Sequence, residues 1–130
     1  STNPENHARM VRTRQAKIDQ VANHIPLLQV QGNTESDTLL VGWGSTEGHL
    51  LAAAKELHCA LAHFNYINPL PKNTAEVLRQ HKRVVVCELN NGQFAAYLRS
   101  KIENISLLQY NEITAQPFSV DRIVNFVNHI

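Results

Sequence analysis

Residues 83–89, RVVVCEL, form the most strand-like run of the chain. A continuous apolar run of this length is typical of a strand buried on both faces, as in the interior of a parallel sheet. The polar residues 90–93, NNGQ, follow directly, and Asn91-Gly92 is typical of a turn that opens a helix. Apolar residues at helical spacing come next. We therefore expect a central strand that leads through a turn into a helix.

On both sides of this strand in the sequence, short apolar runs alternate with segments whose apolar residues recur at helical spacing. Further strands are predicted at 27–30, 38–43, 60–67 and 106–110, and helices over 50–57, from Asn73, over 94–102 and over 120–127. Seven residues, QGNTESD, join the first two strands, so these two pair antiparallel if they are neighbours. The later strands alternate with helices, which requires right-handed parallel crossovers. The pattern predicts an α/β fold of three layers, α/β/α, with a five-stranded mixed sheet in which only the first strand is antiparallel.

A separate helix is predicted before the first strand. Residues 3–5, NPE, have the form of an N-cap, a first-turn proline and a first-turn acid. Apolar residues then recur at helical spacing from Val11 until Pro26. The chain is therefore divided into a lead-in helix, 1–26, and a single α/β domain, 27–130. Ser1 is not a natural initiator, which suggests a piece of a larger subunit.

Composition excludes several functional classes. The chain has 130 residues, of which 43% are hydrophobic and 18% charged, with a net charge of +1. A chain this neutral lacks the basic stripe that nucleic acid or an anionic membrane requires. Its apolar stretches are shorter than the roughly 20 residues that span a bilayer, and its first residues contain no signal core. We expect a cytoplasmic protein that binds neither nucleic acid nor a membrane.

The loops that follow the parallel strands are the candidate site, because ligands bind at the carboxyl ends of such strands. These loops are 44–49, 67–73 and 88–93. Their candidate ligand or interface residues are Gly44, Ser45, Thr46, Asn68, Glu88, Asn90, Asn91 and Gln93.

Each loop also has a structural interpretation. The first could offer backbone N–H groups to an anion, but Glu47 already supplies negative charge there and capping by Ser45 accounts for the sequence. Glu88 could order a polar ligand or a partner's loop. Without a second titratable group it forms no acid–base pair, and a carboxylate bonded to nearby backbone is the favoured interpretation. Asn73, with Glu76 three residues on, has the spacing of a capping box.

Metal and thiol chemistry are disfavoured. Cys59 and Cys87 are too few for a disulfide framework, an iron–sulfur cluster or a four-cysteine zinc site. His58, Cys59 and His63 lie close in sequence, but a helix end and an alternating strand give them no common direction. Cys87 is expected to be a small core residue. No catalytic residue and no metal ligand are predicted.

Three ordered motifs resemble one known family. VGWGST (41–46), FNYINPLPKN (64–73) and VVVCELNNGQ (84–93) resemble the C-terminal domain of the alpha subunit of 2-oxoacid:ferredoxin oxidoreductases, nearest to the 2-oxoglutarate type. The opening residues 3–19 are similar to the helix that leads into that domain, so the resemblance covers essentially the whole chain. It implies a domain similar to the C-terminal domain of transketolase-like enzymes.

The resemblance also implies a function. The holoenzyme of this family oxidatively decarboxylates a 2-oxoacid, here 2-oxoglutarate to succinyl-CoA, and reduces ferredoxin. It uses thiamine diphosphate, magnesium and an iron–sulfur cluster, but this chain has no Gly-Asp-Gly motif and no cysteine cluster to hold them. The implied role is non-catalytic: contacts with the beta subunit and with other domains of its own subunit, together with a wall of a substrate or coenzyme A channel. Ferredoxin and coenzyme A are partners of the holoenzyme.

Two other functions share the predicted fold. One is the C-terminal domain of a transketolase or 2-oxoacid dehydrogenase, although those relatives tend to place a glutamate and a histidine where Asn90 and Asn91 stand. The other is a free-standing module that binds a small ligand.

One junction departs from the expected pattern. Leu57 still belongs to the predicted helix and Ala60 already belongs to the predicted strand, so only His58 and Cys59 link the two elements. A link from a helix to a strand usually takes a few residues and often contains a glycine. The family has a glycine-containing link here. We expect a chain break between His58 and Cys59, or else a helix that stops near Ala54.

Overall fold

A computed structural model describes residues 4–112 and 119–130. Its elements, in chain order, are α1 (Pro4–Ala22), β1 (Val30–Gly32), β2 (Thr38–Trp43), a short 3-10 turn η1 (Gly44–Thr46), α2 (Glu47–Leu57), β3 (Ala60–Phe64), α3 (Thr74–Arg79), β4 (Arg83–Glu88), α4 (Gln93–Lys101), β5 (Leu108–Asn111) and α5 (Val120–Asn128). The expected cap at Asn3 lies outside the described residues. Helix α1 ends at Ala22, before the expected limit at Pro26.

The five strands form one mixed sheet in the order β1-β3-β2-β4-β5. Strand β1 is antiparallel to β3, and the other pairs are parallel, so the predicted fold class is confirmed. The first strand is Val30–Gly32 rather than 27–30, and its neighbour is β3 rather than β2. Strand β2 has parallel partners on both sides and cannot accept β1, which instead pairs with the free side of β3.

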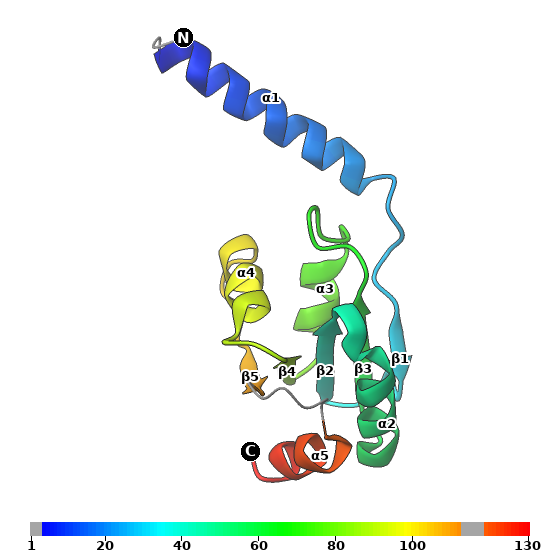
Figure 1. Cartoon of the computed structure of the whole chain (residues 1–130). Helices are drawn as coiled ribbons and strands as arrows, with labels where there is room; N and C mark the ends of the chain where they lie inside the picture. Colours follow the sequence, from blue (N-terminus) through cyan, green and yellow to red (C-terminus); the bar gives the residue numbers. More distant parts are fainter. Residues whose placement is uncertain (1–3, 113–118) are drawn as a thin grey trace.

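Helices cover both faces of the sheet, as predicted (Figure 1). One core cluster lies under α3 and α4 and is built from Leu39, Val41, Ala62, Phe64, Val77, Leu78, Val84, Val86, Phe94, Leu98 and neighbouring residues. The other lies under α2 and α5 and contains Leu40, Leu50, Ala53, Leu61, Val85, Cys87, Ile123 and Val127 among others. Helix α1 lies outside these layers and joins β1 through the segment 23–29 (Figure 1). Among the described residues, no helix is long and apolar enough to cross a membrane.

Strand β4 is an interior strand, with β2 on one side and β5 on the other. Its residues after Arg83 are all buried, and Val85 has no exposed surface. The expected burial on both faces is confirmed for residues 84–88, whereas Arg83 and Leu89 at the two ends of the run are exposed. The middle position of the sheet belongs to β2.

The junction after α2 needs no additional residues, and the expected chain break is wrong. Helix α2 runs to Leu57, and His58 adopts a left-handed conformation at φ 53° and ψ 41°. The N–H of Cys59 donates to Ala54 O at 3.0 Å, and the N–H of His58 donates to Lys55 O at 3.3 Å. This pair of bonds is a Schellman motif, which ends a helix and reverses the chain within two residues. A histidine takes the left-handed position that glycine usually holds.

Neighbouring chain supports this tight turn. The backbone N–H of Asn33 donates to Cys59 O at 3.1 Å, and its side-chain amide donates to His58 O at 3.1 Å. A Cβ atom on Gly32, which has a φ of 77°, would lie 2.6 Å from Cys59 O. A side chain at position 32 would therefore prevent this close approach of the two turns.

Two expected caps are wrong. The residue before α2 is Thr46, not Ser45, and its hydroxyl donates to Trp43 O at 3.1 Å instead of capping the helix. Asn73 precedes α3 but makes no side-chain cap bond, so the capping box with Glu76 does not form. The side-chain amide of Asn73 instead bonds the backbone of Leu28. Its Oδ1 accepts from the N–H of Leu28 at 2.8 Å, and its Nδ2 donates to the C=O of Leu28 at 3.1 Å, as the backbone of a neighbouring strand would.

Candidate functional site

The strand order reverses between β2 and β4, at the carboxyl edge of the parallel strands. Helix α2 carries the chain from β2 to β3 over one face, and α3 carries it from β3 to β4 over the other. In open α/β sheets this switch point is where ligands bind. A cleft of about 170 Å³ lies there, lined by Trp43, Gly44, Ser45, Thr46, Cys87, Glu88, Leu89 and Asn90. The structure thus brings five of the eight candidate residues together.

Glu88 lies at the end of β4 and is 1% exposed. Its Oε1 accepts from the N–H of Phe94 at 2.6 Å, and its Oε2 accepts from the N–H of Ala95 at 3.1 Å. The first N–H groups of a helix have no partner within the helix, and negative charge is favourable there. Both carboxylate oxygens are thus bonded to the start of α4, in the backbone-bonded arrangement that the sequence favoured.

Asn90 organises the turn between β4 and α4. Its Oδ1 accepts from the N–H groups of Gly92 and Gln93 at 2.9 and 3.0 Å. Gly92 has a φ of 87°, in the left-handed region that favours glycine. Asn91 and Gln93 are exposed and do not line the cleft.

The opposite wall of the cleft is the turn η1. Thr46 is buried, and Gly44 and Ser45 are exposed. The lining contains the Glu88 carboxylate and no lysine or arginine. A buried negative charge without a facing cation disfavours a second anion, so the electrostatics of the cleft oppose anion binding.

Trp43 is a cleft residue that the sequence reading missed. Trp43 ends β2. Its ring centroid lies 5.9 Å from that of Phe94, and the ring centroids of Phe94 and Phe64 lie 5.1 Å apart. This aromatic cluster joins β2 and β3 to the first turn of α4. The available signal was the position of the sole tryptophan, directly after a buried strand.

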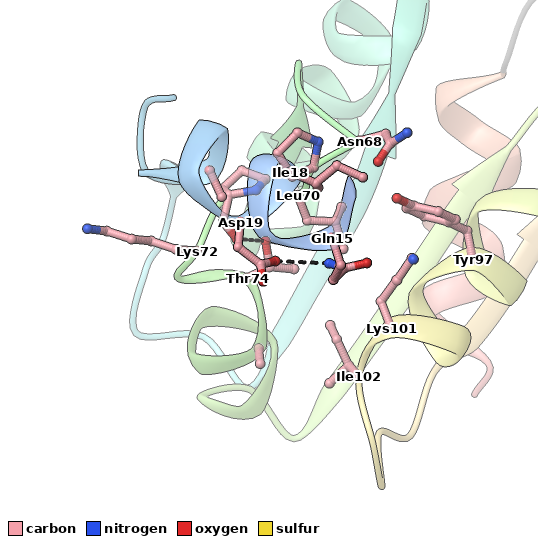
Figure 2. A pocket seen from close by; sticks show the side chains of 14 residues that line it. Gln15, Ile18, Asp19, Asn68, Leu70, Lys72, Thr74, Tyr97, Lys101 and Ile102 are labelled. Atoms are coloured by element: carbon pink, nitrogen blue, oxygen red, sulfur yellow. Dashed lines mark hydrogen bonds between the residues drawn. The ribbon is translucent and has the colours of Figure 1, made fainter. Parts of the chain in front are cut away.

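Asn68 does not reach this cleft. It lines a separate pocket of about 260 Å³ between α1, the loop after β3, α3 and α4 (Figure 2). Tyr97 faces the same pocket, and its hydroxyl donates to Ile67 O at 2.6 Å. Lys101, one turn further along α4, places its Nζ 5.6 Å from the Tyr97 ring centroid. Their spacing of four residues on a helix was the signal that could have identified this pair.

The thiols are buried on the α2 face of the sheet. Loss of hydration raises the pKa of the Cys59 thiol to about 11, and burial also raises that of Cys87. Both are therefore protonated at neutral pH, the form in which a thiol is a poor nucleophile and metal ligand. In residues 4–112 and 119–130, no three His, Cys, Asp or Glu side chains are grouped so as to hold a metal ion.

Fold and site together define a three-layer α/β domain in which the side chains of Thr46, Glu88 and Asn90 at the switch point are bonded to the chain's own backbone. No family model matches the chain. It is homologous to the 2-oxoglutarate oxidoreductase subunit KorA of Mycobacterium tuberculosis, with 40% identity over 133 aligned residues. That match covers 98% of this chain and 20% of the relative, so the chain spans about a fifth of the relative's length.

A solved structure has the same fold. It is a 2-oxoglutarate:ferredoxin oxidoreductase from Magnetococcus marinus with 2-oxoglutarate, coenzyme A and succinyl-CoA bound. The TM-score is 0.86 with 27% sequence identity, over 99% of this chain and 24% of the solved chain. The family resemblance of the sequence motifs is confirmed by both relatives.

Proposed function

We propose that this chain is a non-catalytic structural and subunit-interface domain of the alpha subunit of a 2-oxoglutarate:ferredoxin oxidoreductase. The holoenzyme oxidatively decarboxylates 2-oxoglutarate to succinyl-CoA and reduces ferredoxin. The observation that carries this proposal is the 40% identity to an oxidoreductase subunit along 98% of the chain. The switch-point cleft supports the non-catalytic role, because Glu88 and Asn90 use their side-chain oxygens to hold the start of α4.

The partners of the domain follow from the same proposal. They are the beta subunit and the other domains of its own subunit, with ferredoxin and coenzyme A acting at the level of the holoenzyme in the cytoplasm. We assign thiamine diphosphate, magnesium and the iron–sulfur cluster to other parts of the assembly. The two cysteines of this chain do not fit a cluster, because both are buried in the core beneath α2.

The test uses the complete holoenzyme with variants in the full alpha subunit. We expect Ser45→Ala and Asn91→Ala, both exposed, to change the turnover number for ferredoxin reduction by less than about threefold while assembly stays intact. Deletion of the whole domain should abolish assembly on size exclusion. A loss of more than about a hundredfold from Ser45→Ala in an intact complex would overturn the non-catalytic role. Thiamine diphosphate binding to this chain alone, measured by calorimetry, would also overturn it.

A further inference from the structure

The turn between β4 and α4 contains a chemically reactive dipeptide. Asn91 is the only asparagine of the chain that is followed by glycine. Asparagine is a thermolabile residue, because the backbone nitrogen of the next residue can attack its side-chain carbonyl carbon. A glycine in that next position has no Cβ atom to hinder the attack. Asn91 is also exposed, so water reaches its side chain, and the residue has the surroundings of a deamidation site.

The reaction needs only hydroxide and water. Hydroxide removes the N–H proton of Gly92, the nitrogen forms a bond to Cγ of Asn91, and the side-chain amide nitrogen leaves as ammonia. Water then opens the resulting succinimide ring at one of its two carbonyl groups, which gives aspartate or isoaspartate. The net change consumes water, releases ammonia and leaves a carboxylate at position 91, and nothing is oxidised or reduced.

The attacking nitrogen of this reaction is held by a hydrogen bond. The N–H of Gly92 donates to Oδ1 of Asn90 at 2.9 Å, and the same oxygen accepts from the N–H of Gln93 at 3.0 Å. A hydrogen bond that a group makes in its neutral form disfavours loss of the proton. Removing the proton of Gly92 would also turn a nitrogen anion toward a carbonyl oxygen. Asn90 therefore opposes the first step of deamidation.

The rest of Gly92 is also fixed in place. Its carbonyl oxygen accepts from the N–H of Ala96 at 3.0 Å, within the first turn of α4. Gly92 is buried, and a Cβ atom added to it would lie 2.9 Å from the side-chain amide of Gln109. Ring closure requires the Gly92 nitrogen to approach Cγ of Asn91 to bonding distance. Any movement of the Gly92 peptide for this purpose breaks its bonds to Asn90 and to α4.

We propose that Asn91 is a site of spontaneous deamidation and that Asn90 is a positioning residue that slows the reaction by holding the N–H of Gly92. Isoaspartate at position 91 lengthens the main chain by a methylene group directly before α4. It also adds a negative charge to the turn that follows Glu88. The proposal does not depend on the proposed function, since it concerns the chemistry of the chain's own backbone.

The experiment follows deamidation at position 91 over time at mildly alkaline pH. The 130-residue chain is used, after a thermal melt has shown cooperative folding. Peptide mapping by mass spectrometry measures the product, and enzymatic methylation of isoaspartate identifies the isomer. We expect the folded chain to deamidate about tenfold more slowly than the same chain unfolded in urea. Equal rates in the two states would overturn the proposal.

Variants of Asn90 test its role. Asn90→Ala removes the acceptor and should accelerate deamidation by about twofold to tenfold, the factor that corresponds to one ordinary hydrogen bond. Asn90→Asp keeps an oxygen at the same position and should react no faster than the parent chain. The matched control is Asn125→Ala, at an exposed position of α5, which should leave the rate unchanged. An unchanged rate in a folded Asn90→Ala variant, or acceleration by Asn90→Asp, would overturn the role of Asn90.

Amide hydrogen exchange tests the same bond without a variant. Exchange catalysed by hydroxide removes the same proton of Gly92 that deamidation must remove. We expect the Gly92 amide of the parent chain to exchange at least about tenfold more slowly than in the chain unfolded in urea. An unprotected Gly92 amide would overturn the proposal, whether or not the Asn90→Ala variant folds.

Discussion

The carboxylate of Glu88 accepts the backbone N–H of Phe94 at 2.6 Å, so a residue at the end of a strand bonds the first turn of the following helix. The residue before α4 is Gly92, which has no side chain to cap the helix. The main chain of Glu88 also accepts the N–H of Glu112, beyond β5. One residue therefore connects β4, α4 and the segment after β5.

Replacing this carboxylate should destabilise the domain. Glu88→Gln removes the charge and puts an N–H₂ donor where one acceptor stood, facing an N–H group. We expect a loss of about 1.5–3 kcal/mol in the free energy of unfolding, the usual contribution of hydrogen bonds to a charged group. Urea unfolding measures it. Glu56→Gln, at an exposed position of α2, is the control and should change the value by less than about 0.5 kcal/mol.

The interior position of β4 predicts a severe effect of charge. Val85 has no exposed surface, so Val85→Asp would bury an unpaired carboxylate at a cost of several kcal/mol. We expect no cooperative thermal transition by circular dichroism. Val21→Asp, on α1 where the side chain is 49% exposed, should melt like the parent chain. A cooperative melt of Val85→Asp would contradict the assigned burial.

The turn after α2 predicts a stabilising substitution. His58 has a φ of 53°, where a residue with a Cβ atom is strained and glycine is not. His58→Gly should raise the free energy of unfolding by about 0.5–1 kcal/mol, and the β-branched His58→Val should lower it. Both are compared with the parent chain by urea unfolding. If His58→Val had the same free energy of unfolding as His58→Gly, the left-handed conformation assigned to residue 58 would be wrong.

Burial of Cys59 predicts a loss of stability at high pH. Its pKa is raised from 9.0 to about 11 in the folded chain, so the folded state holds this proton more tightly than the unfolded state. The stabilisation of the folded state that comes from this proton is fully present below pH 9 and is lost as the pH rises through 11. We expect the free energy of unfolding to fall over this interval by roughly 1–3 kcal/mol on account of this thiol. Cys59→Ala should show a shallower fall, and an unchanged slope would argue against a buried thiol.

Local sequence patterns were sufficient for most of the fold. The apolar run of β4 and the helical periods of α4 and α5 depend on neighbouring residues, and the structure has these elements within a few residues of the predicted bounds. The pairing of β1 with β3 was not accessible in this way, because an edge strand's neighbour depends on which sides of the other strands remain free.

The candidate site was predictable only in part. Loops after parallel strands share an edge, so Gly44, Ser45, Thr46, Glu88 and Asn90 could be grouped in advance. Long-range bonds could not be foreseen: Asn73 looks like a cap, but its amide bonds Leu28, 45 residues away. The approach of His63 to Glu47 likewise requires the crossover through α2, which no short motif encodes.

The two outer strands bear on association between copies of the chain. An exposed edge strand is a template on which another chain can add a strand, and a short edge offers few pairing sites. Here β1 has three residues and β5 has four. Asn33, directly after β1, is held against the turn at Cys59, and the N–H of Glu112, just beyond β5, is bonded to Glu88. Both bonds face inward, toward β3 and β4, and leave the outer sides of the two strands unpaired. The shortness of β1 and β5 is therefore what limits the pairing sites that each edge offers to another chain.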